Sequence, residues 1–185
     1  KLHNVKLDNV LDIGAHKGLW TQKFKEHYPD SKVLMIEANE EHIDSLIRVG
    51  PYVTALVGKE NKEVDYYVCE DKNNSHGNGM YKENTNVPFQ SIKKKCVTLD
   101  FLLPDQKFDL IKIDVQGAEL DVLKGASNIL ANCKDIILEL QKVEYNKGAP
   151  LRDEVIEYVK GLGFELIAGP FCDNGPDGDY HFRRL

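Results

Sequence analysis

Short apolar segments with the character of buried β-strands alternate with segments that have one apolar helical face along most of the chain. Residues 9–13 are predicted to form the first strand, and after a glycine turn Trp20, Phe24 and Tyr28 recur at the spacing of one helix face. Strands that alternate with helices in this way form parallel sheets that helices cover. The pattern therefore predicts an α/β fold, and the length suits a single domain over residues 1–185.

The remaining elements follow from the same patterns. Two stretches interrupt them: residues 70–90, which are polar and lack an apolar period, and residues 169–179, which are rich in Gly, Pro and Asp. We expect both to be loops that shape a substrate pocket. Further strands are predicted at residues 32–37, 53–57, 64–68, 95–98, 109–114, 136–140, 164–167 and 180–183, and further helices around residues 43–50, 119–130 and 153–162.

The charge balance limits the expected partners. The 30 acidic residues against 24 Lys and Arg give a net charge of -6, and an acidic surface repels a phosphate backbone, so no nucleic-acid partner is expected. The basic residues 93–95 are interpreted as the solvated entry of a strand. No apolar run approaches the ~18 residues of a membrane span, and residues 1–8 do not resemble a signal peptide. We therefore expect a cytoplasmic enzyme without a membrane partner.

The cysteines give no sign of a metal site or of a disulfide framework. They are widely spaced and form no C-x-x-C pair, so buried reduced thiols are expected. The four are Cys69, Cys96, Cys133 and Cys172.

A glycine turn joins the first strand to the first helix and is the first candidate binding site. It runs from Asp12 to Gly18, and Gly14 and Gly18 permit a tight turn in which a ligand approaches backbone N–H groups. A dinucleotide-binding turn would carry a third glycine where this chain has His16. The turn therefore favours a ligand with a carboxylate and a nucleoside but no diphosphate, and S-adenosylmethionine is such a ligand.

Acidic residues follow three of the predicted strands. Glu37, with Asn39 two residues further on, ends the second strand, where a carboxylate is placed to accept hydrogen bonds from ribose hydroxyls. Asp114 and Glu139 end two later strands and are expected at the same edge of the sheet, Asp114 near the methionine end of the ligand. Lys112 lies within an apolar strand, so it needs a polar partner and is given a structural role.

Taken together, these motifs resemble the FkbM family of methyltransferases. The resemblance covers roughly residues 9–145, and the combination is more specific than any one motif. It is carried by Leu-Asp-Ile-Gly-Ala-His-Lys-Gly at 11–18, Met-Ile-Glu-Ala-Asn at 35–39, Ala-Leu-Val-Gly at 55–58, Val-Thr-Leu-Asp at 97–100 and Ile-Lys-Ile-Asp-Val-Gln-Gly-Ala-Glu at 111–119.

The resemblance implies a Rossmann-like class I methyltransferase, in which a central, mostly parallel seven-stranded sheet has helices on both faces and an antiparallel last strand. It further implies S-adenosylmethionine as methyl donor and O-methylation of hydroxyls on sugars, glycans or related small molecules. Family members commonly carry Asn at the position of His16 and Glu at that of Gln116. The residues that it places around the donor are Asp12, Gly14, His16, Gly18, Glu37, Asn39 and Asp114, with Val57 and Gly58 near the adenine.

Methyl transfer to a hydroxyl needs alignment of the reacting atoms and a proton acceptor. Our hypothesis is that Asp114 positions the donor and that Glu139 or His76 is the base. A metal ion held by Asp114, Glu119 and Glu139 is a less favoured alternative, and no metal is included in the prediction.

Two other functions remain open at this point. One is a catalytically silent S-adenosylmethionine-binding module of a larger glycan-processing protein, since His16 and Gln116 depart from the family pattern and the chain starts at Lys1 without a methionine. The other is an NAD-dependent oxidoreductase, which the missing third glycine of the turn disfavours.

Overall fold

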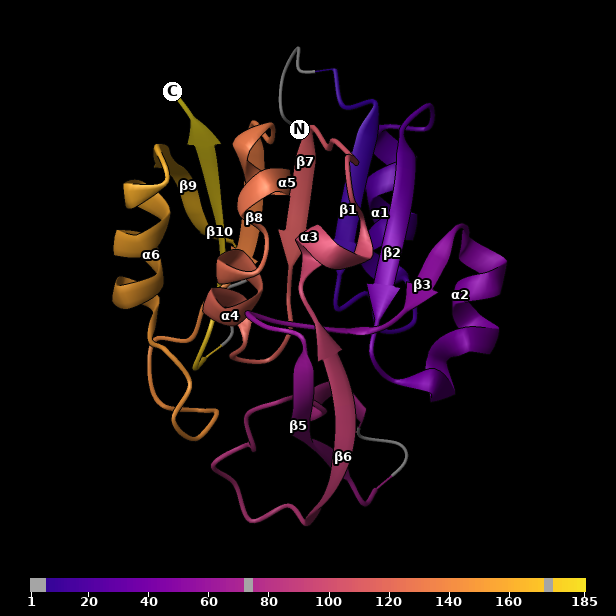
Figure 1. Ribbon diagram of the computed structural model, residues 1–185, viewed down its shortest axis with the longest axis vertical. Helices are drawn as coiled ribbons and strands as arrows, with labels where there is room; N and C mark the ends of the chain where they lie inside the picture. The colour runs from indigo at the N-terminus through magenta and orange to yellow at the C-terminus, as the bar shows by residue number, and fades with distance from the viewer. Residues whose placement is uncertain (1–5, 72–74, 172–174) are drawn as a thin grey trace.

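A computed structural model describes residues 6–71, 75–171 and 175–185. Its central sheet has seven strands in the order β3-β2-β1-β7-β8-β10-β9 (Figure 1). Neighbouring strands from β3 to β8 pair in parallel, whereas β10 pairs antiparallel with both β8 and β9. The strands are β1 (Asn9–Ile13), β2 (Lys32–Glu37), β3 (Tyr52–Thr54), β7 (Leu110–Ile113), β8 (Asp135–Glu139), β9 (Phe164–Phe171) and β10 (Asp179–Arg184).

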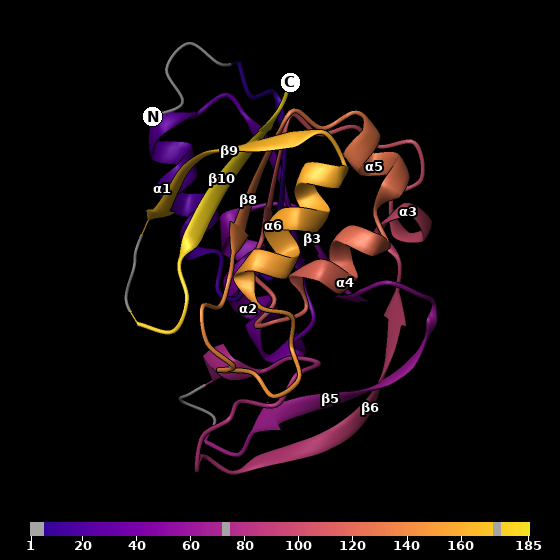
Figure 2. The same ribbon diagram turned by 90° about the vertical axis from the view of Figure 1, so that its left-hand side faces the viewer.

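Helices cover both faces of this sheet. Alternate residues of each strand point to opposite faces, so Val10 packs with Trp20 and Phe24 of α1, while Leu11 belongs to the larger core cluster beneath α4, α5 and α6. Figure 2 shows α1 on one side of the sheet and α4 to α6 on the other. The helices are α1 (Leu19–His27), α2 (Ile43–Val49), α3 (Leu99–Leu102), α4 (Glu119–Lys124), α5 (Ser127–Ala131) and α6 (Arg152–Gly161), with 3-10 turns η1 (Glu40–His42) and η2 (Ser75–Gly77).

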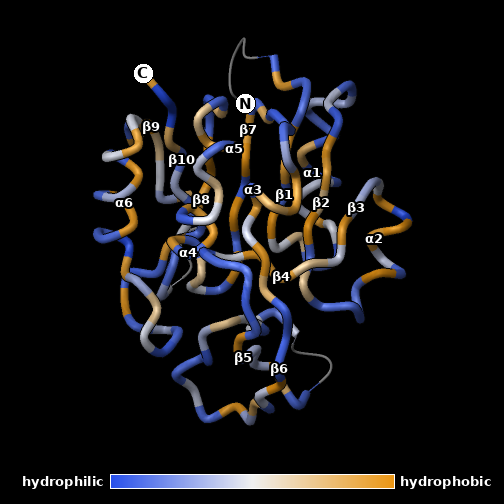
Figure 3. The backbone as a smooth tube through the Cα atoms, viewed as in Figure 1, coloured by the Kyte–Doolittle hydropathy of each residue, from blue (hydrophilic) through white to orange (hydrophobic). Residues whose placement is uncertain are grey.

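The predicted fold class is confirmed: the chain has a Rossmann-like, mostly parallel seven-stranded sheet with helices on both faces and an antiparallel last strand. The core lies in the middle strands, where all four residues of β7 are buried. Figure 3 shows the hydrophobic residues concentrated along these central strands. In the described part of the chain, no helix combines the length and the apolar character needed to cross a membrane.

A second sheet of three strands lies below the carboxyl ends of the parallel strands (Figure 1). Its order is β4-β6-β5, and β5 and β6 form an antiparallel hairpin. The sequence predicts one strand over residues 53–57. This prediction is wrong, because the chain leaves the central sheet at Ala55, so that residues 52–54 and 56–57 pair in different sheets. The Ala55 N–H still donates to Glu37, whereas the Gly58 N–H donates to Val97 of the second sheet. The strands are β4 (Leu56–Val57), β5 (Lys62–Cys69) and β6 (Phe89–Val97).

Three other expectations need correction. β6 begins at Phe89, so the basic residues 93–95 lie within a strand and not at its entry, and Lys93 pairs with Asp65 at 3.0 Å on the neighbouring strand. The loop after β5 is interrupted by η2. The predicted helix 119–130 is two short helices, α4 and α5, because the chain turns at Gly125.

Cys69, Cys96 and Cys133 are buried free thiols, as expected, and Cys172 lies outside the described residues.

Gly125 is where α4 touches the start of the second sheet. A Cβ at this position would lie 2.1 Å from the carbonyl oxygen of Gly58. We therefore expect Gly125→Ala to destabilise the chain by about 1–3 kcal/mol, as overpacking typically does. Thermal unfolding should show a lower Tm, by about 2–4 °C for each kcal/mol.

The matched control is Gly161→Ala at the end of α6, where an added Cβ has open space. This control should unfold at or above the wild-type Tm, since Ala favours a helix over Gly. Equal Tm values for Gly125→Ala and Gly161→Ala would contradict the close contact.

Candidate active site

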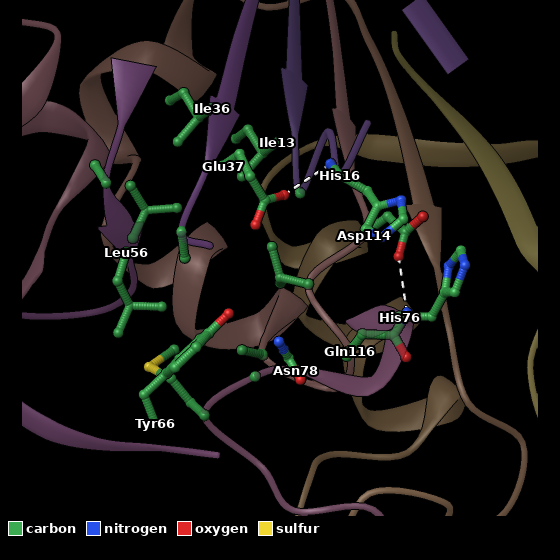
Figure 4. Close-up of a pocket in the computed structure, with 18 of the residues that line it drawn as sticks. Ile13, His16, Ile36, Glu37, Leu56, Tyr66, His76, Asn78, Asp114 and Gln116 are labelled. Carbon is green, nitrogen blue, oxygen red and sulfur yellow. Dashed lines mark hydrogen bonds between the residues drawn. The ribbon is translucent and has the colours of Figure 1, made fainter. Parts of the chain in front are cut away.

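The carboxyl ends of β1, β2, β7 and β8 and the facing side of the second sheet enclose a cavity of about 290 Å³ (Figure 4). Ligands of open α/β sheets bind at this edge. One part of the cavity is apolar and the other is polar. The apolar side is lined by Ile13, Ile36, Ala38, Leu56, Val57, Met80, Val115 and Ala118, and the polar side by His16, Glu37, Ser75, His76, Asp114, Gln116 and Glu139.

Gly14 brings the end of β1 against the end of β7. Its φ is 75°, and an added Cβ would lie 1.7 Å from the carbonyl oxygen of Asp114. The Gly14 N–H donates to the carbonyl oxygen of Ile36 at 2.9 Å, which ties the turn after β1 to the end of β2. Only glycine fits this contact, so the turn leaves room for the cavity behind it.

Glu37 is held by backbone N–H groups at the end of β2. Its Oε2 accepts from the N–H of His16 at 2.7 Å (Figure 4), and its Oε1 accepts from the N–H of Asn39 at 2.7 Å. Burial nevertheless raises the pKa of Glu37, and the backbone hydrogen bonds oppose this effect only in part. The carboxylate is therefore fixed in orientation beside the cavity that it lines.

Lys112 has the polar partners that its burial requires. Its side chain is 6% exposed, and Nζ lies 2.9 Å from Asp114 Oδ2 and 3.6 Å from Asp12 Oδ1. Burial lowers the pKa of Lys112, but the charges of Asp114 and Asp12 outweigh it and raise the pKa above its ordinary value. Asp12 is fully buried and accepts a hydrogen bond from Thr21 at 2.6 Å, so it lies outside the cavity.

Gln116 connects the two carboxyl groups at the polar side. Its Nε2 donates to Asp114 Oδ1 at 3.0 Å and to Glu139 Oε2 at 2.8 Å. Burial and the neighbouring charge of Asp114 raise the pKa of Glu139 well above its usual range. Burial also acts on Asp114, but Lys112 outweighs it and keeps the pKa of Asp114 low. Asp114 therefore loses its proton at lower pH than Glu139 does.

Three histidines meet at the mouth of the cavity. The ring of His16 lies 4.1 Å from that of His42 and 4.2 Å from that of His76, measured between centroids, and His16 Nε2 is 3.1 Å from the hydroxyl of Ser75. Burial, and then the neighbouring His42 and His76, lower the pKa of His16 to about 4. His16 is therefore neutral at physiological pH.

The structure brings together most, but not all, of the residues selected from the sequence. The cavity is lined by Gly14, His16, Glu37, Val57, His76, Asp114 and Glu139. Gly18 instead caps α1, Asn39 caps η1 by accepting from the N–H of Glu41, and Gly58 packs behind the cavity wall against Cys96. Asp12, Gly18, Asn39 and Gly58 thus support the site without lining the cavity.

Several residues that line the cavity were not predicted from the sequence. Tyr66 lies on the same face of β5 as Val64 and Val68, so the period-two pattern offered a signal. No sequence pattern indicated Asn78 and Ser75, because their positions depend on how the loop returns to the sheet. Within the described residues, no group of three or more His, Cys, Asp or Glu side chains is arranged to hold a metal ion.

Glu119 stabilises the turn that carries Gln116. Its buried Oε1 accepts from the N–H groups of Val115 at 3.0 Å and Gly117 at 3.2 Å. Burial raises the pKa of Glu119 to about 7, although these hydrogen bonds oppose it. As pH rises, the unfolded chain loses this proton first, so the stabilisation present at acidic pH is lost as pH approaches 7.

Glu119→Gln keeps an acceptor oxygen and removes the titration. We expect the stability of Glu119→Gln relative to wild type to increase with pH from about 4.5 to about 8, by about 1.4 kcal/mol for each pKa unit of the shift. Urea unfolding of both proteins across this range measures the difference. A difference that does not change with pH would contradict the raised pKa.

Comparisons with known proteins agree with this geometry. The sequence profile of the methyltransferase FkbM domain matches residues 12–166. Methyltransferase sdnD from Sordaria araneosa is 29% identical over 153 residues, which cover 63% of this chain and 59% of that protein. The chain thus spans less than two thirds of this relative's length.

Solved structures show the same fold. The FkbM methyltransferase from Methylobacillus flagellatus superposes with a TM-score of 0.66 at 13% identity, over 95% of this chain and 43% of that one. The plantazolicin methyltransferase BpumL, solved in complex with S-adenosylhomocysteine, gives a TM-score of 0.54 at 10% identity, over 99% of this chain and 78% of that one. With a family match over most of its length and a cavity at the expected sheet edge, the chain belongs to the FkbM family of S-adenosylmethionine-dependent methyltransferases.

Proposed function

We propose that this chain is an O-methyltransferase that acts on a hydroxyl of a sugar, a glycan or a related small molecule. The observation that carries the proposal is the pair of carboxyl groups, Asp114 and Glu139, that Gln116 joins at the polar side of the cavity. A hydroxyl needs a proton acceptor as its oxygen attacks carbon, and a carboxylate within hydrogen-bond reach meets that need.

The cavity residues fit S-adenosylmethionine. Glu37, fixed by two backbone N–H groups, is placed to accept hydrogen bonds from ribose hydroxyls. The Gly14 turn allows close approach of the amino-acid portion, and Asp114, whose negative charge Lys112 maintains, suits its cationic groups. Val57 and the apolar wall suit the adenine.

A bound donor would supply a methyl group on a sulfonium: the acceptor oxygen would gain the methyl and lose its proton, and the sulfur would keep the electron pair of the broken bond. The protein aligns the acceptor and accepts that proton. We assign proton acceptance to Glu139, with Asp114 positioning the donor and Gln116 holding both carboxyl groups. Glu139 must be ionised to act, so the rate should rise with pH as its proton leaves. His76, which is exposed and whose ring lies 4.2 Å from that of His16 at a tilt of 32°, is the other candidate base.

Single replacements test these roles. Glu139→Gln should lower kcat by about 10²- to 10⁴-fold, the range of general-base contributions, and remove the alkaline rise of the rate. Asp114→Ala should weaken donor binding as well, and His76→Ala should change kcat little. Formation of S-adenosylhomocysteine with a panel of hydroxylated sugars gives the rates.

The outcomes separate the candidates. Loss of activity in His76→Ala with a near-normal Glu139→Gln would move the base to His76. Full activity in Asp114→Ala, Glu139→Gln and His76→Ala would remove the proposal. Donor binding by calorimetry without turnover on any acceptor would favour a silent binding module.

A further inference from the structure

Two polar side chains of the second sheet and its loop reach the apolar side of the donor cavity. Tyr66 lies on β5 and is 3% exposed, and Asn78 follows η2. Both line the cavity, and in Figure 4 the hydroxyl of Tyr66 and the amide nitrogen of Asn78 point toward its centre. Among the residues that the structure describes, neither the Tyr66 hydroxyl nor the Asn78 amide nitrogen makes a hydrogen bond.

The ring of Tyr66 is buried, and its hydroxyl opens onto the cavity. Its ring packs in a cluster with Leu56 and Cys96, and the ammonium of Lys94 lies over the ring face, 5.4 Å from the centroid. Within residues 6–71, 75–171 and 175–185 the hydroxyl makes no hydrogen bond. An occupant of the cavity can therefore pair with this hydroxyl without displacing a hydrogen bond of the protein.

The orientation of the Asn78 amide is fixed by the backbone. Its Oδ1 accepts from the N–H of Cys69 at 2.8 Å, and the next residue, Gly79, pairs with Tyr67 through two hydrogen bonds of 2.8 and 3.1 Å. Because Oδ1 is occupied by an N–H donor, the amide nitrogen is the end that faces the cavity. In the described parts of the chain this nitrogen has no acceptor, so it presents a free donor.

We infer that Tyr66 and Asn78 recognise the edge of the adenine of S-adenosylmethionine. Adenine presents an amino donor at N6 beside ring-nitrogen acceptors, and a phenol oxygen and an amide nitrogen complement that pair. The surrounding Ile36, Leu56 and Val57 suit the apolar faces of the ring. The ribose has its own partner in Glu37, on the central sheet.

The second sheet and its loop are thus the part of the chain that recognises the adenine. This assignment concerns the binding of the methyl donor. It does not depend on which hydroxyl accepts the methyl group or on which residue is the general base. Its test needs binding only and is therefore independent of methyl transfer.

Calorimetric binding of S-adenosylhomocysteine and S-inosylhomocysteine tests the assignment. Inosine replaces the N6 amino donor by a carbonyl and turns N1 into a donor, so wild type should bind S-inosylhomocysteine at least 10-fold more weakly, as expected when two hydrogen bonds are lost. Tyr66→Phe and Asn78→Asp should each lower the affinity for S-adenosylhomocysteine by about 3- to 10-fold. Each should also reduce the difference in affinity between the two ligands. Asn78→Asp keeps the oxygen that accepts from Cys69.

Tyr67→Phe is the matched control, since Tyr67 lies on the same strand but does not line the cavity, and it should bind both ligands as wild type does. Without ligand, Tyr66→Phe should unfold at or above the wild-type Tm, because its hydroxyl has no partner to lose. A lower Tm for Tyr66→Phe would indicate a structural role and count against the inference.

Wild-type binding of S-adenosylhomocysteine with unchanged affinities in Tyr66→Phe and Asn78→Asp would overturn this inference alone. Equal affinity of wild type for the two ligands would do the same. A wild-type chain that binds neither ligand would remove the donor site and this inference together.

Discussion

A buried ammonium between two carboxylates organises the centre of this molecule. Lys112 sits inside the most buried strand of the sheet, with Asp12 on one side and Asp114 on the other. Breaking such a group by removing one partner is costly, because an unpaired charge stays behind in the core. The pairing therefore fixes the ends of β1 and β7 relative to each other and keeps Asp114 ionised at the cavity.

The cavity depends on two sheets that differ in character. The central sheet contributes the acidic groups at its carboxyl edge, which are held by backbone N–H groups and by Lys112. The second sheet contributes an apolar wall with few polar atoms. The chain changes from one sheet to the other at Ala55, where a backbone hydrogen bond to Glu37 ends the first pairing. Glu37 and the start of the opposite wall are thus joined directly.

Much of this arrangement could be predicted from the sequence. Glu37, Asp114 and Glu139 lie in one cavity because parallel strands bring their carboxyl ends to one edge, and strand patterns are local. The second sheet could not be predicted, since β4 pairs with β6 across about forty intervening residues and its register depends on tertiary contacts. The bridge from Gln116 to both carboxyl groups also depends on a left-handed backbone, with φ of 55°, that no local pattern indicates. The helix break at Gly125 lies where the chain packs closely against Gly58, a contact that no local pattern indicates.

The unequal affinity of Asp114 and Glu139 for a proton has a thermodynamic consequence. A cation that enters the cavity and the proton on Glu139 compete for the same negative potential, so each weakens the hold of the other. Occupancy by a positively charged molecule is therefore coupled to the release of a hydrogen ion, and its neutral counterpart lacks that coupling. The pH dependence of binding would therefore differ between a charged sulfonium and an uncharged thioether.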